Sequence, residues 1–488
     1  MTLLDVDVWT GSIAADGWVP GGGEPLPVRE AATGAVLGEL GTASLEQVAQ
    51  AARRAAAAQR EWAKLTPSAR AAVLLRAGDI FERDAELIKP WIVRESGGTW
   101  AKAGTEVLAA ISECREAAAL PGHPHGEVLT TNKQRWSIAR RVPAGVVSVI
   151  APFNYPLTLA IRSVAPALAL GNAVLLKPDP RTSVCGGVVV QRVFEEAGLP
   201  EGVLQMLPGG ADVGAAVVSA PEVRIISFTG STAAGRHVGR AAAEHMKRAH
   251  LELGGNNAIV VLPGADLDKA AAAGAFASFL HQGQICQAAG RHLVHESQLE
   301  EYVTKLAAIA DSVRVGDPFA DDGVQVGPII DGRQLAAVSA IVDGAIADGA
   351  TVAAGASASG RCYRPTVLSD VHADMAVWKD EIFGPVAPVM SYRTVDEAIE
   401  IINASDYGLS VAVLGDVGTA MTVADQVVSG VVHINEQTVG DEATAPFGGM
   451  GASGNGSRFG GPGANFEAFT ETQWVTVRPD IESYTLPS

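Results

Sequence analysis

The chain has 488 residues, of which 48% are hydrophobic and 18% charged, and its formal net charge is −18. This composition is typical of a globular protein with large buried cores and argues against an intrinsically disordered chain. The acidic balance argues against nucleic-acid binding, because phosphate recognition needs basic patches. The length corresponds to about three domain-sized units.

The four cysteines are scattered through the sequence at Cys114, Cys185, Cys286 and Cys362. They form no CxxC pair and no Cys/His cluster at metal-ligand spacing, so the sequence predicts no metal site. Unclustered thiols in a long chain favour a reducing compartment over a disulfide framework.

The sequence also lacks the marks of export or membrane insertion. Its first residues have neither the basic region nor the apolar core of a signal peptide. The most apolar stretch, 157–170, contains Arg162 and Pro166 and is too short to span a bilayer. We therefore expect a cytoplasmic protein with no membrane segment.

Short apolar runs alternate with helical stretches from about residue 145 onward. Residues 44–97, rich in Ala, Arg and Glu at helical spacing, predict covering helices before this region. Strands are expected at 146–150, 173–176, 203–207 and 223–228, with helices after the turn 151–156, at 183–197, at 213–219 and after residue 232. Repeated strand–turn–helix units indicate a parallel sheet covered on both faces, with ligands bound at the carboxyl ends of its strands.

A second alternating region runs from a strand at 258–261 to about residue 434. The sequence therefore predicts an α/β fold with two parallel-sheet units, joined near the turn that carries Glu252. The glycine-rich segment 449–463 contains Arg458 and Phe459, so we expect an ordered loop there rather than a linker.

Two segments carry a thiol and a carboxylate beside glycine: Cys286 in 279–287 and Glu252 in 251–257. A nucleophile and a base on tight turns are a recognised catalytic combination. An isolated cysteine, however, is more often a buried apolar side chain. Neither segment is decisive alone.

The segment 228–235 opens a helix directly after a strand. Gly230 would let a ligand approach the backbone, and the free amide groups of the helix start can hold a phosphate. Ser231 or Thr232 can equally be a plain N-cap. The pattern is neither GxGxxG nor a P-loop.

Lys177 and Asn154 each follow an apolar strand. A lysine there can bind a ribose hydroxyl or phosphate, although many strand-end lysines are merely solvated. The Asn154 amide can donate to a developing oxyanion, although turn geometry alone also accounts for an asparagine.

Together these segments resemble the aldehyde dehydrogenase superfamily over nearly the whole chain. The motifs occur in the family's order and at its separations: 152–156 (PFNYP), 177–178 (KP), 228–232 (FTGST), 252–255 (ELGG), 283–286 (GQIC), 381–385 (EIFGP) and 446–449 (PFGG).

The resemblance implies a catalytic set of Cys286, Glu252, Asn154 and Lys177. Cys286 would attack the aldehyde, and Asn154 and the Cys286 N–H would hold the oxyanion. After hydride transfer, Glu252 would activate the water that hydrolyses the thioester, and it would also be able to take the thiol proton earlier. A free thiol has a pKa of about 8.5, so activation must come from the site.

The resemblance also implies a dinucleotide cofactor, with Lys177 and Glu381 on its two riboses. The full expected set is Ile150, Ala151, Pro152, Phe153, Asn154, Lys177, Asp179, Gly210, Gly214, Phe228, Thr229, Gly230, Ser231, Leu253, Gly254, Glu381 and Phe383. Many NAD-preferring relatives carry a glutamate three residues after the lysine, where this chain has Pro180 followed by Arg181. Arg181 can pair with a 2′-phosphate, while Asp179 can replace the glutamate. We expect NAD, with NADP as the alternative.

The finer pattern resembles bacterial benzaldehyde dehydrogenases, in 281–286, 290–295, 434–439, 446–456, 459–461 and 468–472. An aromatic aldehyde needs an apolar slot, for which the candidates are Tyr155, Leu159, Ile285 and Phe447. Arg162 suggests an alternative, because relatives acting on semialdehydes use an arginine here to hold a distal carboxylate. It can instead form a salt bridge at the helix surface or to another subunit.

Other classes remain open at this stage. A coenzyme-A-acylating enzyme would not need Glu252, a non-catalytic relative would tolerate loss of Cys286, and a plain thiol hydrolase would leave Lys177 and Glu381 unused. The presence of Cys286 and Glu252 together with Lys177 and Glu381 favours the aldehyde dehydrogenase interpretation.

The family fold further implies three units: a cofactor-binding unit at 1–120 and 142–253, a catalytic unit at 254–450, and a β-arm at 121–141 and 470–488. The arm would pair across subunits in a homodimer or homotetramer. Residues 474–477 alternate like an edge strand, consistent with such pairing.

Overall fold

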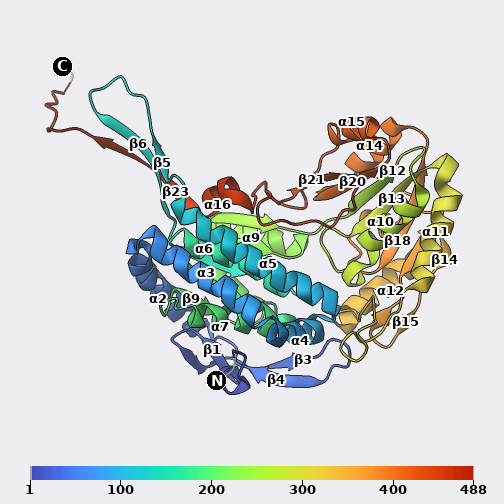
Figure 1. The fold of residues 1–488 in the computed structure, drawn as a ribbon, viewed down its shortest axis with the longest axis horizontal. Coiled ribbons are helices and arrows are strands. Elements are labelled where there is room, and N and C mark those ends of the chain that lie inside the picture. The colour runs from blue at the N-terminus through green and yellow to red at the C-terminus, as the bar shows by residue number, and fades with distance from the viewer. Residues whose placement is uncertain (1–2, 487–488) are drawn as a thin grey trace.

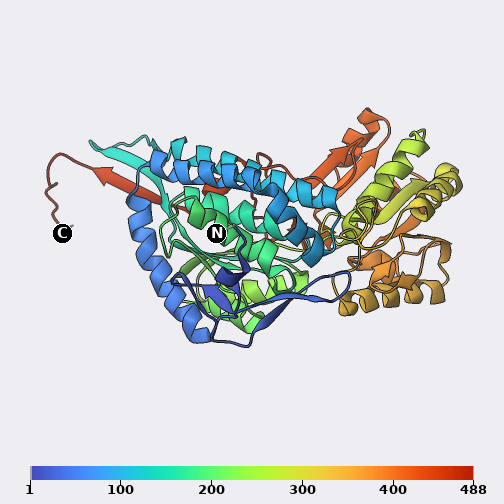
Figure 2. The same ribbon diagram turned by 60° about the horizontal axis from the view of Figure 1, so that its bottom comes forward.

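The computed structural model describes residues 3–486, in which two seven-stranded sheets lie side by side and a thin β-arm projects from one end. In Figure 1 the second sheet lies at the right, and the arm extends at the upper left beside the C-terminus. Figure 2 shows the same separation of the two sheet units from another side. Within the described residues no helix is both long and apolar enough to cross a bilayer.

The first sheet has the strand order β11-β10-β7-β8-β9-β1-β2. The strands span β1 (Ser12–Ala14), β2 (Trp18–Pro20), β7 (Val146–Ile150), β8 (Ala173–Lys177), β9 (Leu204–Met206), β10 (Val223–Thr229) and β11 (Arg248–Glu252). β7 to β11 are parallel, and β1 and β2 add an antiparallel edge. The parallel strands bring their carboxyl ends to one edge of the sheet.

Helices cover both faces of the first sheet. They are α1 (Val6–Trp9), α2 (Leu45–Lys64), α3 (Pro67–Arg83), α4 (Ala85–Ser96), α5 (Trp100–Ala119), α6 (Pro156–Ala169), α7 (Val189–Glu196), α8 (Ala211–Ser219) and α9 (Thr232–Glu244). α6 and α7 pack on the strands from one side, and α2, α8 and α9 from the other. α3 and α5 form an outer layer over α6.

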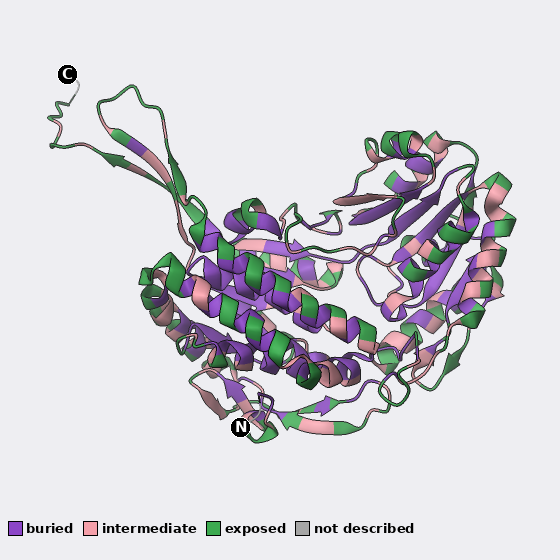
Figure 3. Ribbon diagram, viewed as in Figure 1, coloured by how far each residue is buried: buried purple, intermediate pink, exposed green. Residues whose placement is uncertain are grey.

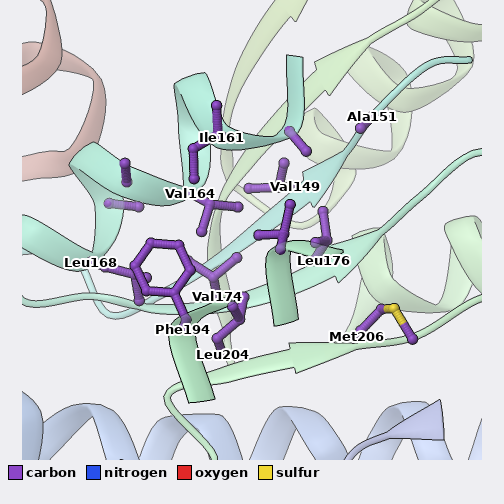
Figure 4. Packing of buried hydrophobic residues seen from close by; sticks show 14 of the residues in the cluster. Val149, Ala151, Ile161, Val164, Leu168, Val174, Leu176, Phe194, Leu204 and Met206 are labelled. Carbon is purple, nitrogen blue, oxygen red and sulfur yellow. The ribbon is translucent and has the colours of Figure 1, made fainter. Parts of the chain in front are cut away.

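The core of this unit explains the continuous apolar strands. Every residue of β8 is buried, as are four of the five in β7, because both faces of the sheet are covered. Val149, Val174 and Leu176 pack against Ile161 and Val164 of α6 in the close view of Figure 4. Figure 3 shows the same burial along the central strands, whereas exposed residues lie on the outer helix faces, in loops and on the arm.

The second sheet has the order β14-β17-β18-β13-β12-β20-β21, parallel except for β14. Its strands are β12 (Asn257–Val261), β13 (Ala289–His295), β14 (Thr351–Ala354), β17 (Thr366–Ser369), β18 (Val386–Tyr392), β20 (Ser410–Leu414) and β21 (Val431–Ile434). Its helices are α10 (Leu267–Phe279), α11 (Leu299–Ser312), α12 (Gly332–Ala347), α13 (Ala376–Lys379), α14 (Val395–Asn403) and α15 (Val417–Ala424). Successive residues of β12 enter two different hydrophobic cores, one on each face.

The arm is a three-stranded antiparallel sheet of order β23-β6-β5, built from β5 (Gly126–Val128), β6 (Trp136–Pro143) and β23 (Thr470–Val477). Helix α16 (Gly461–Phe469) leads directly into β23. Three two-stranded antiparallel sheets complete the described fold: β3 (Leu26–Arg29) with β4 (Val36–Leu40), β15 (Ala358–Ser359) with β16 (Cys362–Tyr363), and β19 (Tyr407–Gly408) with β22 (Met450–Gly451).

The predicted α/β fold with two parallel-sheet units is confirmed, and each expected strand lies within a residue or two of an observed one. The expected helix 183–197 differs at its start, where a π-helical turn spans Val184–Val188 before α7. The segment 449–463, expected to be an ordered loop, contains strand β22 and the first residues of α16 with loop between them. The division into cofactor-binding, catalytic and arm units at the stated boundaries stays a prediction, and residues 1–2 and 487–488 lie outside the described residues.

Candidate active site

The predicted turn residues meet at the carboxyl edge of the first sheet. Lys177 ends β8 and pairs in register with Ile150 at the end of β7, while Thr229 at the end of β10 pairs with Glu252 at the end of β11. Asn154 lies in the turn after β7, so all these positions share one edge.

The loop that carries Cys286 has an unusual backbone. His281 and Gln282 have positive φ angles of 47° and 59°, and Gly283 follows at 66°. A Cβ at Gly283 would lie 2.1 Å from the Gly384 carbonyl oxygen, so only glycine fits there. Non-glycine residues rarely adopt this conformation, and clusters of them mark functional turns.

The surrounding chain fixes the thiol loop at both ends. Gln282 Nε2 donates to the Gly97 carbonyl at 2.9 Å, and Asn257 Nδ2 donates to the Cys286 carbonyl at 2.8 Å. Burial raises the pKa of the Cys286 thiol to about 12, which the nearby Arg162 charge partly opposes. The thiol is therefore protonated at neutral pH and needs a group that takes its proton.

Glu252 is the nearby carboxylate that can accept a proton. Its side chain is buried, and neither carboxylate oxygen has a hydrogen-bond partner among the described residues. Burial raises its pKa to about 8, against the charges of Arg162 and Arg458. A pKa close to the working pH suits a group that exchanges protons with thiol or water.

Asn154 is buried with unused hydrogen-bonding capacity. Its Oδ1 has no partner in the described part of the chain. A buried amide without partners is costly, and such a group is a candidate for binding a ligand atom. The two sheet units thus bring the Cys286 thiol near the Glu252 carboxyl, and Tyr155, the neighbour of Asn154, lies near the same thiol.

Arg162 is buried and already paired. Its Nη1 donates to Asp441 Oδ2 at 2.8 Å, and its guanidinium lies 4.7 Å from the Phe447 ring centroid. The salt bridge considered for Arg162 is therefore present, but it is buried and within the chain rather than at the helix surface. Glu113 lies near this pair, and burial together with the Asp441 charge raises the pKa of Glu113 to about 8 against the charge of Arg162.

The aromatic-slot candidates divide between two places. Tyr155 packs edge-on against His281 with ring centroids 5.4 Å apart. Burial raises the pKa of the Tyr155 phenol, and the charges of Glu106 and Cys286 raise it to a smaller extent. The effect of Cys286 indicates that the Tyr155 ring lies near the thiol. Leu159 and Ile285 are buried, and Phe447 lies under Arg162.

The cofactor-binding candidates fit a dinucleotide in several respects. Lys177 is buried, yet its ammonium donates only to the Pro178 carbonyl among the described residues, leaving two protons for a ligand. Gly214 lies beside the Lys177 stem, where a Cβ would be 3.6 Å from Cδ and Cε. Helix α8 starts at Gly210 with no side-chain cap, so its first amides are free.

At the start of α9 the simpler expectation holds. Ser231 is the N-cap and accepts from the Ala234 N–H at 3.3 Å, which confirms the plain capping alternative. The Gly230 N–H donates to the Glu252 carbonyl at 3.0 Å and is not free for a phosphate. A Cβ at Gly230 would lie 2.7 Å from the Phe228 ring, which explains the glycine by packing.

Arg181, considered as a 2′-phosphate partner, is bound by two carboxylates. Its Nε and Nη2 donate to the two oxygens of Asp179, each at 2.9 Å, and its Nη1 donates to Asp331 at 3.0 Å. Its guanidinium also lies 4.0 Å from the Phe153 ring centroid. Both Asp179 oxygens are thus occupied, and the Arg181 charge is compensated.

Glu381 and Phe383 reach the site from the second sheet unit. Glu381 Oε1 accepts from the Gly255 N–H at 3.0 Å, and burial raises the pKa of Glu381 to about 7. The Phe383 ring packs edge-on against Phe153 at 5.7 Å. A side chain at Gly254 would collide with the Glu381 carboxylate, so this glycine permits the contact.

The other cofactor candidates form the strand ends around this edge. Ile150 ends β7, the Ala151 N–H donates to the Lys177 carbonyl at 3.2 Å, and Pro152 follows it. Leu253 is buried against Gly235 of α9, and its side chain occupies the space that a Cβ at position 235 would need.

Sequence reasoning missed several charged residues that the fold brings to the site. Asp441 meets Arg162 across 279 positions of sequence, and Asp331 meets Arg181 across 150. Lys102 and Glu106 of α5 lie behind the Tyr155 turn. No spacing along the chain signals these contacts, because each depends on the packing of separate units.

Comparison with known proteins gives concordant matches. The sequence profile described as "Aldehyde dehydrogenase family" matches residues 18–475. A vanillin dehydrogenase of Amycolatopsis sp. is 55% identical over 99% of this chain and 100% of its own length. A benzaldehyde dehydrogenase [NAD(+)] of Pseudomonas putida is 46% identical over 96% of each chain. A salicylaldehyde dehydrogenase of Pseudomonas putida G7, solved with salicylaldehyde, superimposes with a TM-score of 0.94, 34% identity and coverage of 97% and 99%.

Proposed function

The chain belongs to the aldehyde dehydrogenase family, and on that premise we propose that it oxidises aromatic aldehydes to carboxylic acids with NAD+. The observation that carries the proposal is the burial of the Cys286 thiol near the Glu252 carboxyl, whose oxygens have no hydrogen-bond partner among the described residues, while Asn154 in the turn after β7 offers its amide N–H as a donor. Nucleophile, oxyanion donor and base are the three groups that oxidation through a thioester requires.

The Glu252 carboxylate takes the Cys286 proton and releases it to solvent, and the Cys286 sulfur attacks the aldehyde carbon to form a thiohemiacetal. The Asn154 amide and the Cys286 backbone N–H stabilise the oxyanion that develops on the former carbonyl oxygen. Arg162 favours the thiolate, because its charge lowers the thiol pKa against the effect of burial. Bound NAD+ supplies the hydride acceptor.

Glu252 serves the second half of the reaction. After the hydride has left, the acyl group remains on Cys286 as a thioester. The Glu252 carboxylate takes a proton from water as the water oxygen attacks the acyl carbon, and the acid leaves as the thiol re-forms. Its pKa of about 8 leaves part of the population ionised at neutral pH.

We assign the cofactor to the set Lys177, Asp179, Gly210, Gly214, Ser231, Leu253, Gly254, Glu381, Phe383 and the strand ends around them. Lys177 has donors for the adenosine ribose, and Glu381 has a free oxygen for the nicotinamide ribose. Arg181 is held by Asp179 and Asp331, so its charge is compensated and it is not available to pair with a 2′-phosphate. We therefore favour NAD+ over NADP+, as in the benzaldehyde relative's own name.

The pairing of Arg162 favours an aromatic substrate over a carboxylated one. A semialdehyde would need an arginine with a free charge for its distal carboxylate. Asp441 pairs with Arg162 at 2.8 Å, so the arginine charge is already compensated within the chain. The buried rings and aliphatic side chains of Tyr155, Leu159, Ile285 and Phe447 suit a ring.

We further propose that the arm joins copies of this chain into a homodimer or homotetramer. Trp136 and Trp474 are each 63% exposed on it, and Val128 is 64% exposed. β23 is an edge strand whose free backbone groups can pair with another chain. Light scattering of the full chain tests this: a monomer would refute it.

The experiment for the function is NADH formation with benzaldehyde, vanillin, succinic semialdehyde and acetaldehyde. We expect the two aromatic substrates to give the highest kcat/KM, and Cys286→Ala to abolish the signal. A preference of orders of magnitude for succinic semialdehyde would refute the aromatic assignment, and activity in Cys286→Ala would refute the mechanism.

A further inference from the structure

The start of helix α6 is held by a carboxylate from another helix. Tyr155, its N-cap residue, makes no side-chain capping hydrogen bond. The N–H groups of Leu157 and Thr158 instead donate to Glu106 Oε2 on α5, at 3.0 and 3.2 Å. The first N–H groups of a helix have no intrahelical partner, so Glu106 supplies the missing cap directly behind the Asn154 turn.

Lys102, one helical turn before Glu106, completes a buried ion pair. Its Nζ donates to Glu106 Oε1 at 2.5 Å and to Ser96 Oγ at 3.1 Å, and the two side chains are 1% and 0% exposed. The same Nζ lies 4.8 Å from the Tyr155 ring centroid. The pair therefore contacts both the backbone and the N-cap side chain of the α6 start.

The same region also contacts the thiol loop. The Tyr155 ring meets His281 of that loop edge-on at 5.4 Å, and Gln282 donates to the Gly97 carbonyl between α4 and α5. The junction of α4 and α5 thus joins the Asn154 turn to the Cys286 loop. A shift at Glu106 would be transmitted to both.

We propose that Glu106 and Lys102 are positioning residues for this reaction. Glu106 fixes the turn that aims Asn154 at the oxyanion, and Lys102 fixes the Tyr155 ring beside the reacting carbon. This inference rests on the proposed role of Asn154, and neither residue touches the reacting atoms. A misplacement of about 1 Å in a site costs on the order of 100-fold in rate, so loss of the Glu106 cap is expected to act on kcat.

The test compares Glu106→Gln with a matched control. Glu95 on α4 is also a buried carboxylate, and it accepts from the Val184 and Cys185 N–H groups at 3.1 and 2.7 Å. Both substitutions replace a buried carboxyl group that accepts two backbone N–H bonds at the start of a helical segment. We expect kcat with benzaldehyde to fall about 100-fold in Glu106→Gln and less than about twofold in Glu95→Gln, with the Kd for NAD+ unchanged in Glu106→Gln.

Lys102→Met keeps the proposal testable if Glu106→Gln does not fold. It leaves Glu106 with its two N–H donors but removes the cation from the Tyr155 ring, a contact whose loss we expect to cost about tenfold. The KM for benzaldehyde should rise by that factor while the KM for acetaldehyde stays constant, and Lys102→Arg should restore it.

The outcomes separate the two levels of inference. An inactive wild-type protein would overturn the proposed function and this inference with it. An active wild-type protein whose Glu106→Gln variant keeps the kcat of Glu95→Gln would overturn the positioning role alone. An equal KM change for both aldehydes in Lys102→Met would do the same for Lys102.

Discussion

Replacing Asp441 with asparagine should turn the enzyme toward carboxylated aldehydes. The substitution keeps the shape of the side chain and removes the charge that Arg162 contacts at 2.8 Å. Besides Nη1, which donates to Asp441, Arg162 has a buried Nε donor that has no partner in the described chain. An arginine released from Asp441 can then bind a carboxylate on the substrate.

The size of the change follows from the geometry. A hydrogen bond to a charged group contributes about 2 kcal/mol, equal to about thirtyfold in kcat/KM. Breaking a buried ion pair costs about 3–5 kcal/mol of stability. Asp441 is 26% exposed and other carboxylates lie near Arg162, so we expect a loss at or below the lower end of that range.

The assay is the ratio of kcat/KM for 4-carboxybenzaldehyde to that for benzaldehyde. The control is Asp331→Asn, which removes a carboxylate of similar exposure, 31%, from Arg181 at 3.0 Å. We expect a rise of about thirtyfold in Asp441→Asn and none in the control. An unchanged ratio in Asp441→Asn would refute the idea that Asp441 screens Arg162 from the substrate.

Four further predictions concern protons and the cofactor. Because Glu252 must be ionised to activate the water that hydrolyses the thioester, kcat should rise with pH through about 8 and level off about one unit higher, and a kcat that is flat between pH 6 and 9 would contradict this. The folded state keeps the Glu252 proton between the ordinary pKa of 4.5 and about 8, so stability should fall as pH rises through that window. Glu252→Gln should therefore be more stable than wild type at pH 9, by up to about 5 kcal/mol in urea unfolding, and a lower stability there would refute the burial penalty. Alkylation of Cys286 by iodoacetamide should still accelerate above pH 9 and become slower in Arg162→Met; equal rates in the two proteins would exclude activation by Arg162. Asp179→Asn should release Arg181 and raise kcat/KM for NADP+ relative to NAD+ by about tenfold. An unchanged ratio would show that Arg181 does not influence the choice of cofactor.

The strand–turn–helix order was predictable because it depends on local patterns. Continuous apolar runs at 146–150 and 173–176 identify buried parallel strands, and the turn after each strand identifies the edge of the sheet. The resemblance then supplied roles for Cys286 and Glu252. Their closeness to Arg162 and Asn154 follows from the fold, since both sheet units contribute to one edge.

The sequence did not predict which charged side chains form ion pairs, because the two partners of each pair lie far apart along the chain. Nothing near Arg181 indicated that Asp331 would hold it, or that both Asp179 oxygens would be occupied. The sequence likewise left two partners possible for Arg162, a substrate carboxylate or a salt bridge, and the fold places Asp441 beside it. Ser231 is the opposite case: its capping role is local, and the sequence contained it as an alternative.

Arg162 connects selection of the substrate with activation of the thiol. Its charge lowers the pKa values of both Cys286 and Glu252, which burial raises. An arginine without a partner would lower them further, but it would also attract carboxylated substrates and leave a charge uncompensated in the interior. Asp441 removes those two effects at the expense of activation, because its own charge raises the same two pKa values. The ion pair therefore balances reactivity against selectivity, and the Asp441→Asn variant should show both changes together: a more acidic thiol and a wider substrate range.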